Sequence, residues 1–269
     1  MSGQRKQPEN APITADYGAE QYGATSRSYA YNSDPFLEAE LKRLAFDDAA
    51  IRRGFIRKVF AMVFLQLLVV VAMIAVARSV AGVNTYVMER PWMTLVALVV
   101  FLIVYVSLMC CADVRRKFPM NIILLLVLTV VLGFLTVSIS AQYNTNLIVQ
   151  AGGIVCGVLL VIVLITTCTK FDITKYVFII AIVGMVAAFS GIFLLLGSWL
   201  FNSPVMDTIY SGMMAVVFTL YLFFDIQMIM GGRSIELTPE EYILASTQVF
   251  IDVVYLFWVV LRLLGGGRR

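Results

Sequence analysis

The sequence predicts an all-α, multi-pass membrane protein with seven transmembrane helices. Hydrophobic residues make up 61% of the 269 residues, and the mean hydropathy is +0.90. Charged residues make up 14%, whereas soluble domains carry roughly 25%. Uncharged apolar runs recur along the chain, and a helix needs about 20 such residues to cross a bilayer. These observations exclude a soluble globular domain.

Charged or turn-forming residues bound each predicted span. The stretch 118–169 has no charge and is too long for one span, so the polar AQYNTN at 141–146 is expected to divide it. GGR at 231–233 is a helix stop after the sixth span. TPEE at 238–241 is typical of a capping box, with proline at the first position of the last helix. The seven predicted spans are 59–77, 92–112, 119–140, 148–168, 175–197, 205–230 and 239–264.

The segments outside the spans differ in composition. Residues 1–45 are rich in Gly, Ala, Ser and Tyr without an apolar period, which predicts a disordered cytoplasmic tail. This tail has no apolar core of a signal peptide. Residues 46–58 are expected to form a basic juxtamembrane helix, residues 59–264 the seven-helix membrane domain, and residues 265–269 a C-terminal tail.

The distribution of Lys and Arg predicts the orientation in the membrane. Fifteen of the 20 basic residues lie on the side of the N-terminus, counting alternate loops. Because basic residues favour cytoplasmic loops, the N-terminus is expected in the cytoplasm. Seven spans place Arg268 and Arg269 on the far side, which these two charges oppose. A re-entrant last segment that returns the C-terminus to the cytoplasm therefore stays open.

Composition also excludes several kinds of site. The chain has no His, which removes the commonest zinc ligand and the usual pH switch. If the protein senses pH, carboxylates must do so. No basic stripe lies outside the membrane flanks, so nucleic acid is not expected as a partner.

Asp225 and Asp252 are the main candidate site residues. Each lies inside one of the last two apolar segments, in LYLFFDIQMIM and QVFIDVVYLFW. A charge near the bilayer centre costs about 2.5 to 3.5 kcal/mol, so such residues are usually functional. At 1.5 Å per residue they lie roughly 9 and 15 Å from the loop that joins the two helices, so tilt could bring the carboxyls together.

Polar side chains accompany both aspartates at helical spacing. Tyr221 precedes Asp225 by four residues, and Gln248 and Tyr255 flank Asp252. These stripes indicate an internal, protein-lined or watered face. The alternative is that both carboxyls are protonated and serve only as interhelical hydrogen bonds.

Arg115 and Arg116 form a third candidate group. They lie in CCADVRRKFPMN, the short loop between the second and third spans. This loop is expected on the same side as the loop before the last span, so one arginine could reach Asp225. Simple anchoring at the membrane surface is the alternative.

Four segments resemble the transmembrane Bax inhibitor motif family, specifically its Lifeguard branch. They are FIRKVF, CCADVRRKFPMN, FFDIQMIMGGR and LTPEEYILASTQVFIDVVYLFWVVLRLLG, within residues 50–265. The resemblance implies a seven-helix fold with the C-terminal helix central, and residence in plasma or internal membranes, of which ER or Golgi is expected here. It also implies suppression of cell death and a calcium leak gated by two aspartates. Asp225 and Asp252 match that pair, and the partnering arginine falls at Arg115 or Arg116.

The function favoured by these observations is a pH-sensitive calcium leak channel that lowers stored calcium and opposes apoptosis. Calcium takes hard oxygen ligands, so both aspartates are candidates for transient Ca²⁺ ligands. Two nearby carboxyls repel when both are ionised, so the pair titrates as a unit. No cofactor is expected. The expected partners are the bilayer, calcium ions and regulatory proteins of cell death.

Two other classes compete with a channel. One aspartate on each of two neighbouring spans also describes an intramembrane aspartyl protease, but VFID precedes Asp252 where those proteases have GxGD. The prediction is therefore that the protein is not an enzyme. A receptor or adaptor would instead recruit partners through the tail, which contains Tyr17, Tyr22, Tyr29 and Tyr31.

Overall fold

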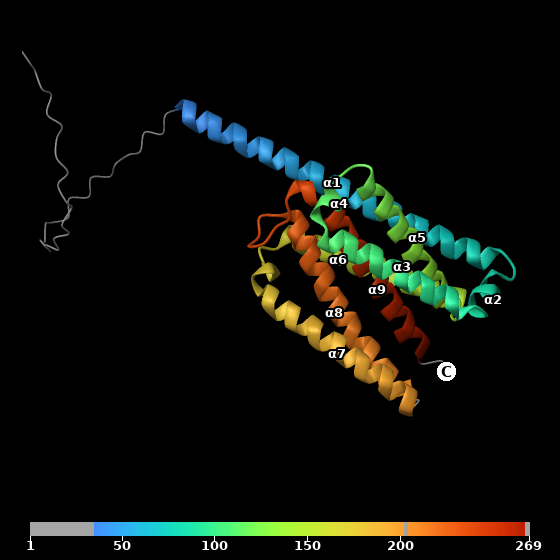
Figure 1. Ribbon diagram of the computed structural model, residues 1–269. Helices are drawn as coiled ribbons and strands as arrows, with labels where there is room; N and C mark the ends of the chain where they lie inside the picture. Colours follow the sequence, from blue (N-terminus) through green and yellow to red (C-terminus); the bar gives the residue numbers. More distant parts are fainter. Residues whose placement is uncertain (1–34, 202–203, 267–269) are drawn as a thin grey trace, which may run out of the picture. The chain divides into compact units, whose positions relative to one another are not determined.

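The computed structural model describes residues 35–201 and 204–266, and every element in these ranges is helical (Figure 1). Most of the predicted tail and the last three residues lie outside the described ranges. Six helices are long and apolar enough to cross a membrane. The prediction of an all-α, multi-pass membrane protein is therefore confirmed. These six are α1 (Pro35–Ser79), α3 (Pro91–Cys110), α5 (Met120–Ser140), α6 (Thr145–Cys168), α8 (Pro204–Met230) and α9 (Tyr242–Gly266).

The remaining predicted span corresponds to α7 (Val177–Phe201). Its apolar part, measured together with the preceding turn over the described residues, is Ile173–Ala187, which is shorter than a full span. The count of seven spans therefore stays a prediction. Four short helices lie between the long ones: α2 (Val83–Met88), α4 (Ala112–Arg116), η1 (Ile173–Tyr176) and η2 (Pro239–Glu241).

The start of α1 corrects the expected end of the disordered tail. The tail was expected to reach residue 45, but α1 begins at Pro35 and continues without a break through the first span. The segment 36–45 is FLEAELKRLA, made up mainly of Leu, Ala, Glu, Lys and Arg. These are strong helix formers, which explains why the helix extends beyond the membrane-spanning residues.

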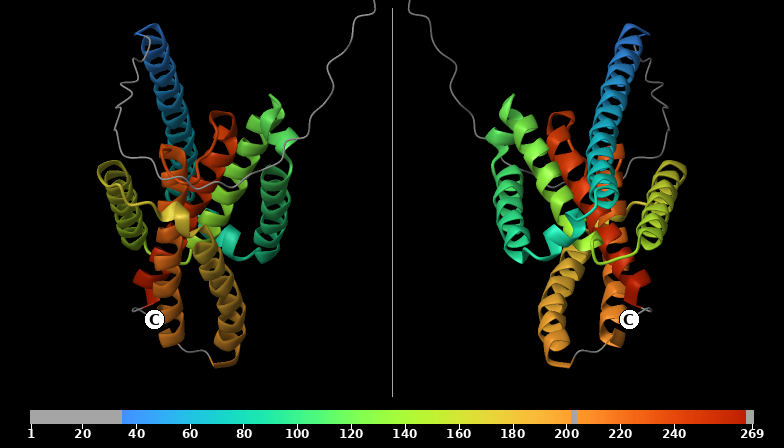
Figure 2. Two further views of the ribbon diagram at one scale, coloured as in Figure 1. Left: turned by 90° about the vertical axis from the view of Figure 1, so that its left-hand side faces the viewer. Right: turned by 90° about the vertical axis from the view of Figure 1, so that its right-hand side faces the viewer.

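The C-terminal helix α9 is central in the unit formed by residues 44–269. It packs against α5, α6 and α8, and Figure 2 shows it in dark red inside the helical bundle. Half of its most apolar stretch is buried in protein, against 17% for α3. One apolar cluster joins α9 to α1, α6 and α8, and a second joins α9 to α1, α3 and α5. The helix thus connects two cores.

The connections between helices follow the predicted turns. α5 ends at Ser140 and α6 begins at Thr145, on either side of the expected turn. α8 ends at Met230 and is followed by Gly231 and Gly232, whose φ angles are 75° and 69°. Side chains other than glycine rarely adopt this left-handed conformation, so the GGR stop is explained.

The predicted capping box at the start of α9 is wrong in its details. Pro239 does occupy the first position, but the Thr238 side chain makes no capping hydrogen bond, and residues 239–241 form a 3-10 turn. The Glu241 carboxylate, which a capping box would direct back to the backbone, is instead bound by two arginines. A guanidinium–carboxylate pair carries a charge on both partners, whereas the capping-box bond to a backbone amide carries one only on the carboxylate.

Candidate functional site

Asp225 and Asp252 face one another across the contact between α8 and α9. The two carboxyls lie close enough for their side chains to interact directly. Asp225 is buried, with 6% of its surface exposed. An ionised carboxylate can only accept hydrogen bonds, so a hydrogen bond between the two groups requires one of them to carry a proton. Helix packing therefore brings together two residues that lie 27 positions apart in the sequence.

Several oxygens on the helix that carries Asp252 have no hydrogen-bond partner in the described part of the chain. They are Asp252 Oδ2, Gln248 Oε1 and Thr247 Oγ1, all buried and all within residues 247–252 of α9. Within the described ranges, no cluster of three or more His, Cys, Asp or Glu side chains could hold a metal ion. Two carboxyls with neutral oxygens alongside are suited to weak, transient contact with a hard cation.

The other predicted polar residues have different positions. The Tyr221 hydroxyl donates to the Ile180 carbonyl at 3.1 Å, which connects α8 to α7. The Tyr255 ring packs against Phe218 and Trp258, with ring centroids 5.4 and 5.0 Å away. Of the three supporting residues, Gln248 is the one that presents an unpartnered oxygen. Tyr221 and Tyr255 mainly hold helices together.

Arg115 and Arg116 bind Glu241. Arg115 Nε lies 2.6 Å from Glu241 Oε2, and Arg116 Nε lies 3.0 Å from Glu241 Oε1. Arg116 Nη2 also donates to Oε1. Arg115 Nη1 donates to the Met109 carbonyl at 2.9 Å, near the end of α3. Both arginines thus fix the turn before α9 to α3 and α4.

The expected contact between these arginines and Asp225 is therefore corrected. Both arginines lie on α4, and the carboxylate that they bind belongs to η2, the turn at the start of α9. Asp225 lies deeper, within α8, where its partner is Asp252. A guanidinium that is satisfied by a nearby carboxylate gains nothing by reaching into apolar surroundings.

Sequence reasoning missed Glu241 and Gln227 as site residues. Gln227 is fully buried two positions after Asp225. Its Oε1 accepts from the Ile173 amide and its Nε2 donates to the Phe171 carbonyl, both at 2.9 Å. Its place in the apolar FFDIQMIM could have identified it, since a buried amide in a span needs partners. The TPEE pattern is typical of a helix cap, so it does not indicate that Glu241 binds arginines.

The loop between α8 and α9 is held at several points on the same face. Arg52 on α1 pairs with Glu236 at 2.6 Å and donates to the Leu237 carbonyl at 2.6 Å. Asp172 accepts hydrogen bonds from the amides and hydroxyls of Thr174 and Ser234. Burial raises the pKa of Asp172, but these bonds outweigh it and lower the pKa to about 2. The loop is thus anchored to α1 and to the segment before α7.

This fold and site define a class: multi-pass helical membrane proteins with a carboxyl pair between their last two helices. The family model described as "Inhibitor of apoptosis-promoting Bax1" matches residues 52–269. This chain belongs to that family, which confirms the family resemblance of its sequence motifs.

Named relatives support the Lifeguard resemblance. The chain is 33% identical over 259 residues to Protein lifeguard 3 of Homo sapiens, covering 96% of this chain and 81% of that protein. It is 33% identical over 261 residues to Protein lifeguard 3 of Mus musculus, with the same coverage. It is 26% identical over 222 residues to Protein lifeguard 4 of Mus musculus, covering 80% of this chain and 85% of that protein.

Proposed function

We propose that this protein is a pH-sensitive calcium leak channel of an internal membrane, which lowers stored calcium and thereby suppresses apoptosis. The observation that carries the proposal is the close approach of the Asp225 and Asp252 carboxyls, on two neighbouring helices that can span a membrane. In this proposal the protein lies in the ER or Golgi membrane with its N-terminus in the cytoplasm, and it is not an enzyme.

The shared proton supplies a gate. A hydrogen bond between a carboxyl and a carboxylate is roughly twice as strong as one between neutral groups. This bond holds α8 against α9 while Asp225 and Asp252 share one proton. A second proton neutralises the pair and leaves a weaker bond, so the two helices separate more readily. Calcium leak therefore increases as pH falls.

The unpartnered oxygens on α9 support an ion path. Asp252 Oδ2, Gln248 Oε1 and Thr247 Oγ1 lie within about one and a half turns of one helix. Each is a hard oxygen of the kind that calcium prefers. Conduction requires binding strong enough for an ion to enter and weak enough for it to leave. Separation of α8 from α9 would expose the Asp252 carboxyl to a passing ion.

In this proposal Arg115 and Arg116 form an arginine latch, which acts on Glu241. Arg115 and Arg116 hold Glu241 at the start of α9, and Arg115 also contacts the end of α3. Releasing Glu241 frees the first turn of the helix that carries Asp252. The latch thus restrains the start of this helix, and the aspartate pair restrains its middle.

Flux from liposomes tests the channel. The purified full chain is reconstituted with an internal calcium dye, and leak is recorded between about pH 8 and pH 6. Leak should rise steadily as pH falls, because the second proton weakens the α8–α9 contact. No calcium leak above that of protein-free liposomes at any pH would contradict the channel. A leak that is unaffected by pH would contradict the gate.

A cell assay links flux to survival. The matching family is described as an inhibitor of apoptosis-promoting Bax1, and protection here is proposed to follow from reduced calcium stores. A variant that folds and localises normally but conducts no calcium should fail to protect cells. Full protection by such a variant would favour the adaptor, which acts through protein partners.

A further inference from the structure

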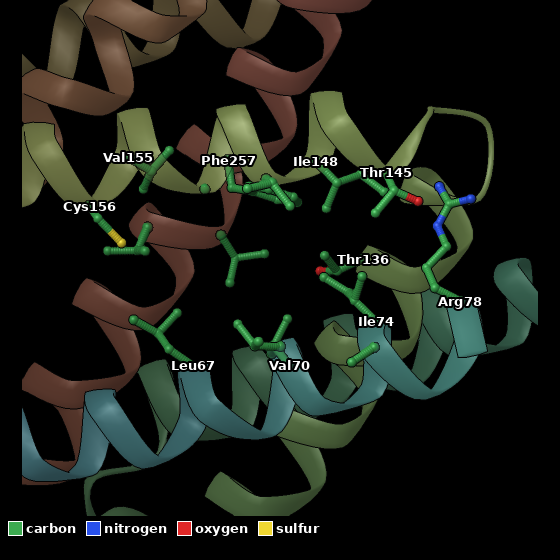
Figure 3. A pocket seen from close by; sticks show the side chains of 16 residues that line it. Leu67, Val70, Ile74, Arg78, Thr136, Thr145, Ile148, Val155, Cys156 and Phe257 are labelled. Atoms are coloured by element: carbon green, nitrogen blue, oxygen red, sulfur yellow. The ribbon is translucent and has the colours of Figure 1, made fainter. Parts of the chain in front are cut away.

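A groove with a volume of about 480 Å³ lies between α1, α6 and α9 (Figure 3). Its walls include Leu67 and Ile74 from α1, Ile148 and Val155 from α6, and Phe257 from α9. This volume lies within the range of about 300 to 1,000 Å³ that is typical of small-molecule sites. All three helices can span a membrane, so the molecules around the groove are lipids.

The groove is closed on the protein side and open on the lipid side. Val70, Val155 and Val253 line it and are buried. Val71 on α1 and Val149 on α6 also line it, but 64% and 67% of their surfaces are exposed. The groove therefore opens sideways between α1 and α6, toward the hydrocarbon of the bilayer.

One end of the groove is polar. Arg78 lies there with Thr136 and Thr145, and Figure 3 shows its guanidinium beyond the apolar side chains. Arg78 belongs to the last turn of α1. Its Nη2 donates to the carbonyls of Ser140, at 2.6 Å, and Tyr143. Because α5 ends and α6 begins at this level, Arg78 lies where headgroups meet the hydrocarbon.

The charge of Arg78 is available to a ligand. Within the described part of the chain, its Nε and Nη1 groups donate to no acceptor and no carboxylate pairs with it. The two carbonyls that it binds position the guanidinium without neutralising it. A fixed cation at the end of an apolar groove complements a molecule with an anionic head and an apolar chain.

We propose that this groove binds one acyl chain of an anionic phospholipid, with the lipid phosphate bound by Arg78. The planar guanidinium matches phosphate oxygens, which accept two parallel hydrogen bonds. The sideways opening lets the second acyl chain remain in the bilayer, so a two-chain lipid fits without leaving its leaflet. The leaflet is the one at the membrane face where α1 ends.

Substitution of neighbouring glycines on α6 tests occupancy of the groove. Gly152 lines the groove, whereas its neighbour Gly153 does not. A Cβ atom at either position meets nothing within 4 Å. Gly152→Leu should therefore fill the groove without disturbing the helix, and Gly153→Leu is the matched control. Native mass spectrometry of the full chain in neutral detergent counts bound phosphatidylglycerol and phosphatidylcholine of identical chains.

The wild-type protein should retain one phosphatidylglycerol and bind it about tenfold more tightly than phosphatidylcholine, because only the anionic lipid satisfies Arg78. Gly152→Leu should lose this binding, and Gly153→Leu should keep it. Equal affinity for the two lipids in the wild type would overturn the proposal. Equal binding by the two glycine variants would overturn it as well.

Charge at position 78 gives the second test. Arg78→Gln should abolish the preference for phosphatidylglycerol, whereas Arg78→Lys should retain most of it. Arg90→Gln is the control, since Arg90 lies on the same membrane face and stacks on Tyr86 at 3.7 Å. Thermal unfolding without lipid checks the fold, and the lysine and glycine variants still decide the question if Arg78→Gln does not fold. Binding of oleate but not phosphatidylglycerol, with the same dependence on Gly152, would overturn the assignment to a phospholipid.

Discussion

The Gln66 side chain on α1 donates through Nε2 to Thr129 Oγ1 on α5, at 3.1 Å and with both residues buried. Thr129 Oγ1 itself donates to the Leu125 carbonyl at 2.7 Å. Gln66 Oε1 has no partner within the described ranges. The contact therefore combines one satisfied amide nitrogen with one unsatisfied amide oxygen.

This asymmetry predicts different effects for the two partners. Thr129→Val should lower the free energy of unfolding by about 1 kcal/mol, because it leaves the whole Gln66 amide unsatisfied. Gln66→Met should be nearly neutral, since it removes both the bond and the unpartnered oxygen. The double variant should therefore be more stable than Thr129→Val alone. Unfolding measured in detergent checks the order, and simple additivity of the two changes would contradict it.

The aspartate pair predicts coupled effects on flux. The double change Asp225→Asn and Asp252→Asn removes both titrating groups, so leak should no longer depend on pH. Each single change leaves one carboxyl without its carboxyl partner and should shift the midpoint of the pH dependence. Asp113→Asn is the control, because Asp113 is exposed on α4. If all variants fold and keep the wild-type pH profile, the pair is a packing contact and the gate is wrong.

The arginine latch predicts unequal roles for its two members. Arg115 is 15% exposed and Arg116 is 51% exposed. Arg115→Ala should therefore destabilise the protein by about 2 kcal/mol, whereas Arg116→Ala should have a smaller effect, as expected for an exposed pair. Glu241→Gln weakens both contacts and should raise calcium leak at every pH. Thermal unfolding and liposome flux measure the two effects.

Asp172 predicts a pH dependence of stability outside the membrane spans. Its pKa is about 2 in the folded protein, against about 3.9 for an unperturbed aspartate. The unfolded chain therefore binds the proton first as pH falls. The stability contributed by Asp172 is complete above about pH 4 and is lost progressively toward pH 2.

Asp172→Asn tests this contribution. The variant should be less stable than the wild type by about 1 kcal/mol at pH 7, a value reduced for solvent screening of a partly exposed group. The difference should shrink below about pH 4. Chemical unfolding at pH 7, 4 and 3 measures it. A difference that stays constant over this range would contradict the assigned role.

The helices could be predicted from sequence because charges and turn residues mark their ends. The uncharged stretch 118–169 divided where expected, and Gly231 has the positive φ that ends α8. The pairing of Asp225 with Asp252 was within reach because a short loop joins their helices. In these cases the relevant interactions are local or limited to neighbouring helices.

Contacts between distant segments could not be predicted in the same way. Glu241 binds arginines that lie more than a hundred positions earlier, and its local pattern already matched a helix cap. The groove at Arg78 depends on how α1 and α6 are spaced around α9, which no local pattern records. The Gly- and Ser-rich composition of the first part of the tail does not extend to residues 36–45, so the composition of the tail as a whole does not predict the early start of α1.

The central position of α9 has a consequence for biosynthesis. The ribosome makes α9 after α5, α6 and α8, yet all three pack against it, and both apolar clusters contain its residues. Until α9 is present, the inner faces of these helices, including Asp225, must be covered by lipid or by the insertion machinery. Assembly of the bundle is therefore completed only after α9 has been synthesised and has packed against the helices that precede it.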